Sequence, residues 1–302
     1  MINIDEFKNK RVLVIGDLML DKYVWGDVER ISPEAPVPVV NVKEETYTLG
    51  GAGNVIKNIV SLGGNVTAIG MIGKDYNGKL LTKELIKLRH NFYNCCLYSD
   101  RPTTTKTRVM CSNHQMIRID NEESKPINSK DQRQLLNAIT NHVHKCDIVV
   151  LSDYNKGVIT REIIYRAALK ARLHNKISIV DPKNKNFMIY RDVDIITPNK
   201  KEYDEAVNIQ NKTILITCGD SGMRLIEPDK PDFNILSNAK QVFDVSGAGD
   251  TVVATLALSM ASGGTLKESA ILSNIAGGLV VSKLGTATIS TNELKREYKW
   301  KK

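Results

Sequence analysis

A regular alternation of short apolar runs with helical segments constrains the fold of this chain most. The apolar runs are typical of buried strands, and they are Val12–Ile15, Val66–Met71, Ile148–Leu151, Ile177–Val180, Asp194–Thr197 and Ile214–Thr217. The helical segments are Ala52–Leu62, Asn77–His90, Asp131–His144, Thr160–His174, Thr251–Ser262 and Leu266 to about Lys283. Strands and helices in alternation predict a three-layer α/β fold, in which helices cover both faces of a mostly parallel central sheet.

Two β-like segments interrupt the alternation. They are rich in Thr, Val and charge and are bounded by turns, as hairpins are. Their strand-like parts are Val37–Val42, Thr46–Leu49, Thr103–Met110 and Met116–Asp120. No crossover helix accompanies them, so we expect a small separate sheet, with lid segments at about 35–50 and 100–120. Such a sheet could close over a site, and its exposed edge could pair with a second copy, which predicts a homodimer.

Composition limits the class of protein. The 302 residues carry 42 Lys and Arg against 34 Asp and Glu, a net charge of +8, and 42% are hydrophobic, which excludes a disordered or fibrous chain. No run approaches the ~18 apolar residues of a membrane span. The five cysteines include no C-x-x-C pair, so we expect a cytoplasmic protein with reduced thiols. The densest basic cluster, from Lys295 to Lys302, is interpreted as a solvated tail, so neither nucleic acid nor membrane is expected as a partner.

The stretch Asp244–Thr251 carries the strongest chemical signal. Its small residues, Ser246–Gly249, let backbone N–H groups converge at the start of a helix, whose positive end attracts an anion. Asp250 beside them could accept a proton from a hydroxyl that attacks phosphorus. Alternatively, Asp250 simply caps the helix. This motif alone leaves the two interpretations about even.

Two more loops follow predicted strands. Asn199 and Glu202 lie three residues apart on one helical face, where they could orient the water ligands of magnesium. From spacing alone, an N-cap with a glutamate at its third position is favoured. Thr217, Gly219 and Gly222 could hold nucleotide phosphates, and a plain turn explains them equally well.

Charged and amide side chains near the amino terminus suit a polyhydroxylated ligand. Asp17 and Asp21 leave the first predicted strand four residues apart, and a glycine-rich stretch containing Gly51 and Asn54 precedes a helix. A single stretch of this kind is weak evidence, because glycine-rich helix starts are common.

Cations in the predicted lid suit a phosphate. Lys106 and Arg108 face one side of a strand, and with Arg118 they could bind a phosphate group, although they could also guard an exposed edge. Lys156 and Lys183 each follow a strand, and they could reach a phosphate or lie at the loop surface.

These motifs, in this order, resemble the ribokinase-like sugar kinases, a family also named after the minor phosphofructokinase. The two signature regions match Gly50–Asn54 and Asp244–Thr251, and the resemblance covers nearly the whole chain. A narrower series is similar to the D-glycero-β-D-manno-heptose 7-phosphate kinase branch: Gly16–Asp21, Arg30–Val40, Thr103–Arg108, Gln115–Asp120, Leu151–Gly157 and Asp181–Lys183. The resemblance implies one ribokinase-like domain over residues 1–302 with a small β-sheet lid.

The resemblance also implies an activity. It is the magnesium-dependent transfer of the ATP γ-phosphoryl group to the anomeric hydroxyl of a heptose 7-phosphate, within ADP-heptose synthesis for lipopolysaccharide. Asp250 would be the base, beside an anion hole of Gly247, Ala248 and Gly249. The implied substrate-binding residues are Asp17, Asp21, Gly51, Asn54, Lys106, Arg108, Arg118, Asp153 and Lys156. The implied nucleotide-binding residues are Lys183, Asn199, Thr217, Gly219, Gly222 and Asn274, and Asn199 and Glu202 would hold Mg²⁺ through water.

Two departures from the family remain. The first is a short crossover. Only eleven residues separate Glu202 from the strand at Ile214, which leaves room for a short helix, Tyr203–Val207, and a turn, but not for a full second helix. We also expect no nucleotidyltransferase domain, so that this chain alone would not complete ADP-heptose. The alternatives are a kinase for another sugar or sugar phosphate, or a catalytically weak binding protein of the same fold. The presence of Asp250 argues against the binding protein, which has no need of a base.

Overall fold

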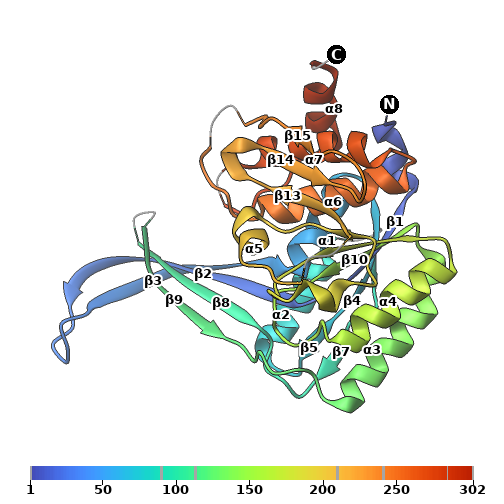
Figure 1. The fold of residues 1–302 in the computed structure, drawn as a ribbon. Helices are drawn as coiled ribbons and strands as arrows, with labels where there is room; N and C mark the ends of the chain where they lie inside the picture. The colour runs from blue at the N-terminus through green and yellow to red at the C-terminus, as the bar shows by residue number, and fades with distance from the viewer. Residues whose placement is uncertain are drawn as a thin grey trace.

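The computed structural model describes residues 2–88, 91–111, 114–208, 211–239, 242–283 and 285–300. In these residues a central sheet is built from β1 (Arg11–Gly16), β4 (Asn65–Ile69), β6 (Phe92–Asn94), β10 (Ile148–Ser152), β11 (Ile177–Asp181), β12 (Ile195–Ile196), β13 (Thr213–Thr217), β14 (Met223–Ile226) and β15 (Phe233–Ile235). Their order is β15-β14-β13-β12-β11-β10-β1-β4-β6 (Figure 1). The pairs between β13 and β6 are parallel, and β14 and β15 join antiparallel. The predicted α/β class is confirmed.

Helices cover both faces of this sheet. They are α1 (Ala52–Ser61), α2 (Tyr76–Ile86), α3 (Ser129–His142), α4 (Arg161–Leu173), α5 (Lys200–Asp204), α6 (Ala248–Ala261), α7 (Leu266–Val280) and α8 (Thr291–Trp300). Short 3₁₀ helices lie at Ile4–Asn9, Val143–Lys145, Phe187–Tyr190 and Gly219–Ser221. The helix predicted at Asn77–His90 ends at Ile86, and His90 lies outside the described residues.

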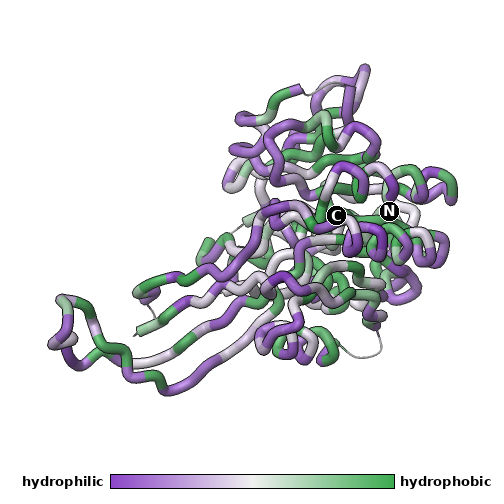
Figure 2. The backbone as a smooth tube through the Cα atoms, turned by 90° about the horizontal axis from the view of Figure 1, so that it is seen from below, coloured by the Kyte–Doolittle hydropathy of each residue, from purple (hydrophilic) through white to green (hydrophobic). Residues whose placement is uncertain are grey.

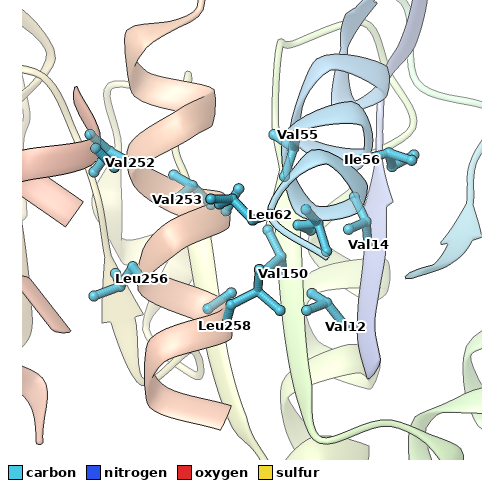
Figure 3. Packing of buried hydrophobic residues seen from close by; sticks show 14 of the residues in the cluster. Val12, Val14, Val55, Ile56, Leu62, Val150, Val252, Val253, Leu256 and Leu258 are labelled. Atoms are coloured by element: carbon cyan, nitrogen blue, oxygen red, sulfur yellow. The ribbon is translucent and has the colours of Figure 1, made fainter. Parts of the chain in front are cut away.

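The side chains of β1 show how the two layers of helices are held. Val12 and Val14 point into a core shared with α1, α6 and α7, and Figure 3 shows both valines in one cluster with residues of α1 and α6. Leu13 and Ile15 point the opposite way, into a second core shared with α3 and α4. Successive strand residues face opposite sides of a sheet, so a strand buried on both faces is a continuous apolar run. This is why the sequence pattern identified the strands.

A second sheet projects from the body of the molecule, and we call it the lid (Figures 1 and 2). In the described residues its order is β3-β2-β8-β9, from β2 (Leu18–Ile31), β3 (Pro38–Gly51), β8 (Thr105–Cys111) and β9 (His114–Asn121). The separate strand-like parts predicted in 37–49 are wrong: β3 is continuous and pairs with β2 along its length. The pattern missed β2, because it is buried at its base and exposed at its tip. A small parallel pair, β5 (Met71–Gly73) and β7 (Leu97–Ser99), lies outside both sheets.

Two other local expectations are corrected. The short helix is Lys200–Asp204 rather than Tyr203–Val207, because reciprocal hydrogen bonds between Asn199 and Glu202 fix the start of the helix. The basic cluster is not simply a solvated tail: Lys295 lies in α8 and pairs with Asp5. Lys301 and Lys302 lie outside the described residues. Among the helices that the structure describes, none is long and apolar enough to cross a membrane.

Candidate active site

Asp250 lies in the first turn of α6, not just before the helix as the predicted start at Thr251 implied. The helix begins earlier because Gly247 takes a left-handed conformation, with φ at 78°, and serves as its N-cap. A Cβ at Gly247 would lie 2.5 Å from Nδ2 of Asn54, so the close approach of α1 to this turn also requires glycine. The turn places the Asp250 side chain, only 5% exposed, at the amino-terminal end of α6.

Two neutral donors hold the Asp250 carboxylate. Asn54 Nδ2 donates to Oδ2 at 2.7 Å, and the Tyr154 hydroxyl donates to Oδ1 at 2.8 Å. Burial raises the pKa of Asp250 to about 6, although both hydrogen bonds lower it. A carboxylate with this pKa is ionised at neutral pH and is a better base than an exposed aspartate. The other amide atom of Asn54, Oδ1, is buried and has no hydrogen-bond partner among the described residues.

Backbone N–H groups converge at the start of α6, as the sequence predicted, with one change. The Ala248 N–H donates to the carbonyl of Val245 at 3.2 Å, so it does not contribute. Within the described residues, the N–H groups of Gly247, Gly249 and Asp250 have no acceptor. A helix start with free N–H groups attracts phosphate oxygens. The N–H groups left free at this turn are therefore those of Gly247, Gly249 and Asp250, and Ala248, which the predicted anion hole included, is not among them.

A cavity of about 700 Å³ opens beside this turn. Five predicted nucleotide residues from three segments line it, together with Gly249 of α6: Asn199, Thr217, Gly219, Gly222 and Asn274. Asn274 Nδ2 donates to the Leu236 carbonyl at 2.7 Å, which fixes the loop that forms one wall. The other lining residues include Val242, Val252 and Val281, so the wall suits an apolar ring. The cavity therefore joins the predicted nucleotide residues to the amino-terminal end of α6.

A second cavity, of about 190 Å³, continues from the first and contains Asp250. Asn199, Thr217 and Gly249 line both cavities. Lys183 lines this second cavity rather than the first, and its Nζ pairs with Glu202 at 2.7 Å. The predicted nucleotide residues therefore surround one continuous space that reaches Asp250.

Acidic side chains line this second cavity and fit a magnesium ion bound through water. Asp181 and Glu202 lie on the same wall, and burial together with the charge of Asp250 raises the pKa of Asp181 well above its usual value. In the described residues no side chain hydrogen-bonds the Asp181 carboxylate, which leaves its oxygens for water. Asn199 and Glu202 do form the capping box, and Oε1 of Glu202 accepts a hydrogen bond from Lys183. In the described part of the chain, no three His, Cys, Asp or Glu side chains are grouped as direct ligands.

Asp17 is buried beneath the loop after β10. Its carboxylate accepts hydrogen bonds from the N–H groups of Tyr154, Lys156 and Val158, at 2.9, 3.1 and 3.1 Å. With 1% of its surface exposed, the structure assigns Asp17 to holding this loop, rather than to the substrate contact expected from the sequence. The same loop carries Tyr154, whose hydroxyl donates to Asp250.

Asp153, in the same loop, faces the second cavity. Its carboxylate accepts hydrogen bonds from the Tyr190 hydroxyl and from the Asn155 N–H. Burial raises its pKa to about 6.

Gly51 is the N-cap of α1, the helix that carries Asn54, and its φ is 55°. A Cβ at Gly51 would lie 2.5 Å from the Asp17 carbonyl oxygen, so this position requires glycine.

The predicted lid cations all lie on one face of the lid sheet. Arg108 pairs with Asp21 of β2 at 2.7 Å, and its guanidinium lies 5.3 Å from the centre of the Tyr23 ring. Arg118 stands directly opposite Arg108 on β9 and contacts Asp120 with two nitrogens, at 3.0 and 3.1 Å. The expected one-sided arrangement of Lys106 and Arg108 is therefore present, and each arginine already has a carboxylate partner.

Two residues of the site were not singled out from the sequence: Tyr154 and Asp181. They stand inside the motifs Leu151–Gly157 and Asp181–Lys183, so the motifs included these residues but gave them no role. Tyr154 contacts a residue 96 positions away, a relationship that local spacing cannot reveal.

The fold and this site define the class of protein, a carbohydrate kinase. Residues 9–293 match the family model described as pfkB family carbohydrate kinase. The chain therefore belongs to the pfkB family of carbohydrate kinases, as its resemblance implied.

Sequence relatives and solved structures show which proteins this chain is similar to. The chain is 43% identical to the bifunctional protein HldE of Desulfatibacillum aliphaticivorans and 42% identical to that of Caulobacter vibrioides, over 96% and 95% of its length. It spans 63% of the length of each relative. Among solved structures, phosphofructokinase-2 from Escherichia coli in complex with potassium has a TM-score of 0.78 at 20% identity, covering 96% of this chain and 99% of that one. Ribokinase from Arabidopsis thaliana, complexed with ribose and ATP, has a TM-score of 0.71 at 19% identity, with the same coverage.

Proposed function

We propose that this chain transfers the γ-phosphoryl group of ATP to the anomeric hydroxyl of D-glycero-β-D-manno-heptose 7-phosphate. The product would be the 1,7-bisphosphate, an intermediate of ADP-heptose and lipopolysaccharide core synthesis. The observation that carries the kinase chemistry is the buried carboxylate of Asp250, which adjoins free N–H groups at the end of a nucleotide-sized cavity. The similarity to HldE proteins and the matching motif series support the choice of sugar.

The proposed reaction is an in-line displacement at phosphorus. The anomeric oxygen forms a bond to the γ-phosphorus, the bond to the ADP oxygen breaks, and Asp250 takes the hydroxyl proton. The N–H groups of Gly249 and Asp250 would stabilise the charge on the transferred group. Asp181, Glu202 and Asn199 would hold Mg²⁺ through water, and the ion would neutralise charge on the ATP phosphates. The unpaired Oδ1 of Asn54 and the Asp21 carboxylate would accept hydrogen bonds from sugar hydroxyls.

The lid also supports a proposed homodimer. Its strand β9 is exposed along its whole length, and Ile117 and Ile119 on it are 55% and 54% exposed. Val28, Ile31 and Val42, on β2 and β3, are also exposed. Apolar side chains on an open sheet edge favour pairing with a second lid. Sedimentation that gives a monomer at micromolar concentration would remove this part of the proposal.

The use of ATP and the five unpaired cysteines favour the cytoplasm as the location of the enzyme.

A substrate panel tests the proposed function. ADP release is measured with heptose 7-phosphate, hexose 6-phosphates, the same sugars without phosphate, and water, and the product is identified by ³¹P NMR. We expect the highest kcat/KM with heptose 7-phosphate and a new anomeric phosphate signal. Preference for an unphosphorylated sugar or a hexose phosphate would replace the heptose assignment with another sugar kinase activity. No turnover with any sugar, together with measurable ATP binding, would favour the binding-protein alternative.

A further inference from the structure

A buried polar contact joins α1 and α6 next to the hydrogen bond between Asn54 and Asp250. The Thr251 hydroxyl lies 2.8 Å from Oδ1 of Asn58, and both residues are fully buried. Asn58 lies one helical turn after Asn54 on the same face of α1, and Thr251 directly follows Asp250 in α6. A second hydrogen bond between side chains therefore links the same two helices, one step away from the carboxylate.

The amide of Asn58 fixes the direction of this second hydrogen bond. Its Nδ2 donates to the Asn54 carbonyl at 2.9 Å. A flipped amide would place Oδ1 against that carbonyl oxygen, and two acceptors would face each other, so Oδ1 faces Thr251 and the hydroxyl donates. The hydroxyl also lies 3.2 Å from the Gly247 carbonyl, an acceptor in its own helical turn. Because a hydroxyl has one proton, the bond to α1 and the bond within α6 are alternatives.

The rest of the interface between these helices is rich in apolar side chains. α1 and α6 pack through the core that also includes Val12 and Val14 of β1, and Figure 3 shows residues of both helices in it. Apolar contacts have no preferred direction, so they tolerate small shifts of one helix against the other. A buried hydrogen bond has a direction, and breaking it leaves a polar atom without a partner. The contact between Thr251 and Asn58 therefore favours one relative position of the two helices.

This relative position determines how Asp250 meets Asn54. Asp250 and Thr251 are neighbours in the first turn of α6. A rotation of α6 that separates Thr251 from Asn58 therefore also weakens the hydrogen bond on Asp250. That bond from Asn54 lowers the pKa of Asp250, against the effect of burial. The unpaired Oδ1 of Asn54 belongs to the same amide, so its direction depends on the same bond.

We propose that Asn58 and Thr251 are positioning residues, which hold the Asp250 carboxylate against Asn54 in the orientation that phosphoryl transfer requires. Neither Asn58 nor Thr251 lines the two cavities of the site, so both act through Asp250 and Asn54 rather than on a substrate. The inference rests on the proposed function, in which Asp250 is the base. It predicts that loss of this buried contact changes the base itself, in addition to any change in stability.

Three variants separate positioning from stability, and all three lack the hydrogen bond between the helices. Thr251→Val leaves Oδ1 of Asn58 buried without a donor, so it should lower the thermal unfolding temperature most. Asn58→Leu should lower it less, because the hydroxyl can turn to the Gly247 carbonyl. The double variant Asn58→Leu, Thr251→Val removes both polar partners, so it should be more stable than Thr251→Val alone.

All three variants should show the same change at Asp250. Its pKa is measured by ¹³C NMR of labelled aspartate carboxyl groups, with the signal assigned by its loss in Asp250→Asn. This pKa should rise by about half a pH unit, because the hydrogen bond from Asn54 weakens. The acid limb of kcat/KM should move to higher pH by the same amount, and kcat should fall about tenfold with the KM for ATP nearly unchanged. The other titratable groups that act on Asp250 or line its cavity are left unchanged: Asp21, Asp153, Tyr154, Asp181, Lys183 and Glu202.

Thr255→Val is the matched control. Thr255 is also fully buried in α6, and its hydroxyl donates to the Thr251 carbonyl at 2.8 Å, within the helix. The control removes a buried hydroxyl of the same kind whose hydrogen bond does not reach α1. The pKa of Asp250, the acid limb and kcat should therefore keep their wild-type values. Thr251→Ser retains the hydroxyl and should also behave as the wild type. If Thr251→Val does not fold, Asn58→Leu and the double variant decide.

The outcomes separate this inference from the proposed function. An Asp250 pKa that is unchanged in the folded variants, or that returns to the wild-type value as stability returns in the double variant, would overturn the positioning role. A shift in Thr255→Val as large as in Thr251→Val would overturn it too. An Asp250 pKa that rises as expected, in a protein that phosphorylates no sugar, would support the positioning of the carboxylate and contradict the proposed function.

Discussion

The hydroxyl of Tyr154 donates to Oδ1 of Asp250 at 2.8 Å, across 96 residues of sequence. Asn54 donates to the other oxygen, so the carboxylate is held by two neutral groups and by no cation among the described residues. A cation would lower the pKa of the carboxylate far more than a hydroxyl does. The arrangement therefore orients the carboxylate proposed as the base and leaves its pKa at about 6.

The first prediction concerns this hydrogen bond. Tyr154→Phe removes a donor that lowers the pKa of Asp250, so that pKa rises above about 6. The base works only when ionised, so the rate falls as the pH drops through its pKa, and this acid limb of kcat/KM should move to higher pH. A net hydrogen bond of about 0.5–1.5 kcal/mol corresponds to a shift of up to about one pH unit. A pH profile from 5 to 9 measures it. An acid limb that stays in place would show that Tyr154 does not act on the base.

The second prediction concerns the turn before α6. Gly247→Ala places a Cβ against Asn54 and forces alanine into a left-handed conformation, so it should reduce the free energy of unfolding by about 1–2 kcal/mol and reduce kcat as well. Gly249→Ala is the matched control for stability, because no heavy atom lies within 4 Å of its added Cβ. It should fold as stably as the wild type and still raise the KM for ATP, since Gly249 lines both cavities. Equal stability of the two variants in urea denaturation would contradict this account of the turn.

Much of the fold could be predicted, because short stretches of sequence determine its strands and helix starts. Buried parallel strands are continuous apolar runs, and the capping box at Asn199 follows from the pattern of four consecutive residues. The lid was predicted only in outline. Its long strand β2 changes from buried to exposed along its length, and neither alternation nor an apolar run describes it.

The site was predictable where a motif carries its own geometry. Gly247 and Asp250 belong to one turn, and the structure keeps them together at the start of α6, although the helix begins at Ala248 rather than at Thr251. The partners of these residues come from distant segments, and no local pattern encodes them. Asp17 shows the limit: a carboxylate after a strand suits a sugar, yet its oxygens meet N–H groups about 140 residues later, a contact that only the folded chain creates.

The third prediction tests this structural role of Asp17. Asp17→Asn leaves one oxygen for Tyr154 and Lys156 but turns an amide N–H toward the N–H of Val158. The Val158 N–H and the new amide N–H are then both left without an acceptor, and since one such buried donor costs about 1–3 kcal/mol, the free energy of unfolding should fall by at least that amount. Chemical denaturation measures the change. A variant with normal stability and a raised KM for the sugar would restore Asp17 as a substrate contact.

The fourth prediction concerns the nucleotide cavity. Asn274→Ala removes the hydrogen bond to the Leu236 carbonyl that fixes one wall, so the KM for ATP should rise several-fold while the KM for the sugar phosphate stays constant. Titration of each substrate at saturating concentration of the other separates the two effects. A change confined to the sugar KM would mean that the larger cavity does not hold the nucleotide.

The most direct test of the account is the turnover of Asp250→Asn with heptose 7-phosphate and ATP. The asparagine can accept from Asn54 and donate to the Tyr154 oxygen, and it removes a buried charge, so the variant should be at least as stable as the wild type and bind both substrates. Without a general base, kcat should fall by about 10²–10⁴-fold. A folded variant with near-wild-type kcat would show that Asp250 only caps its helix, and would contradict the proposed mechanism.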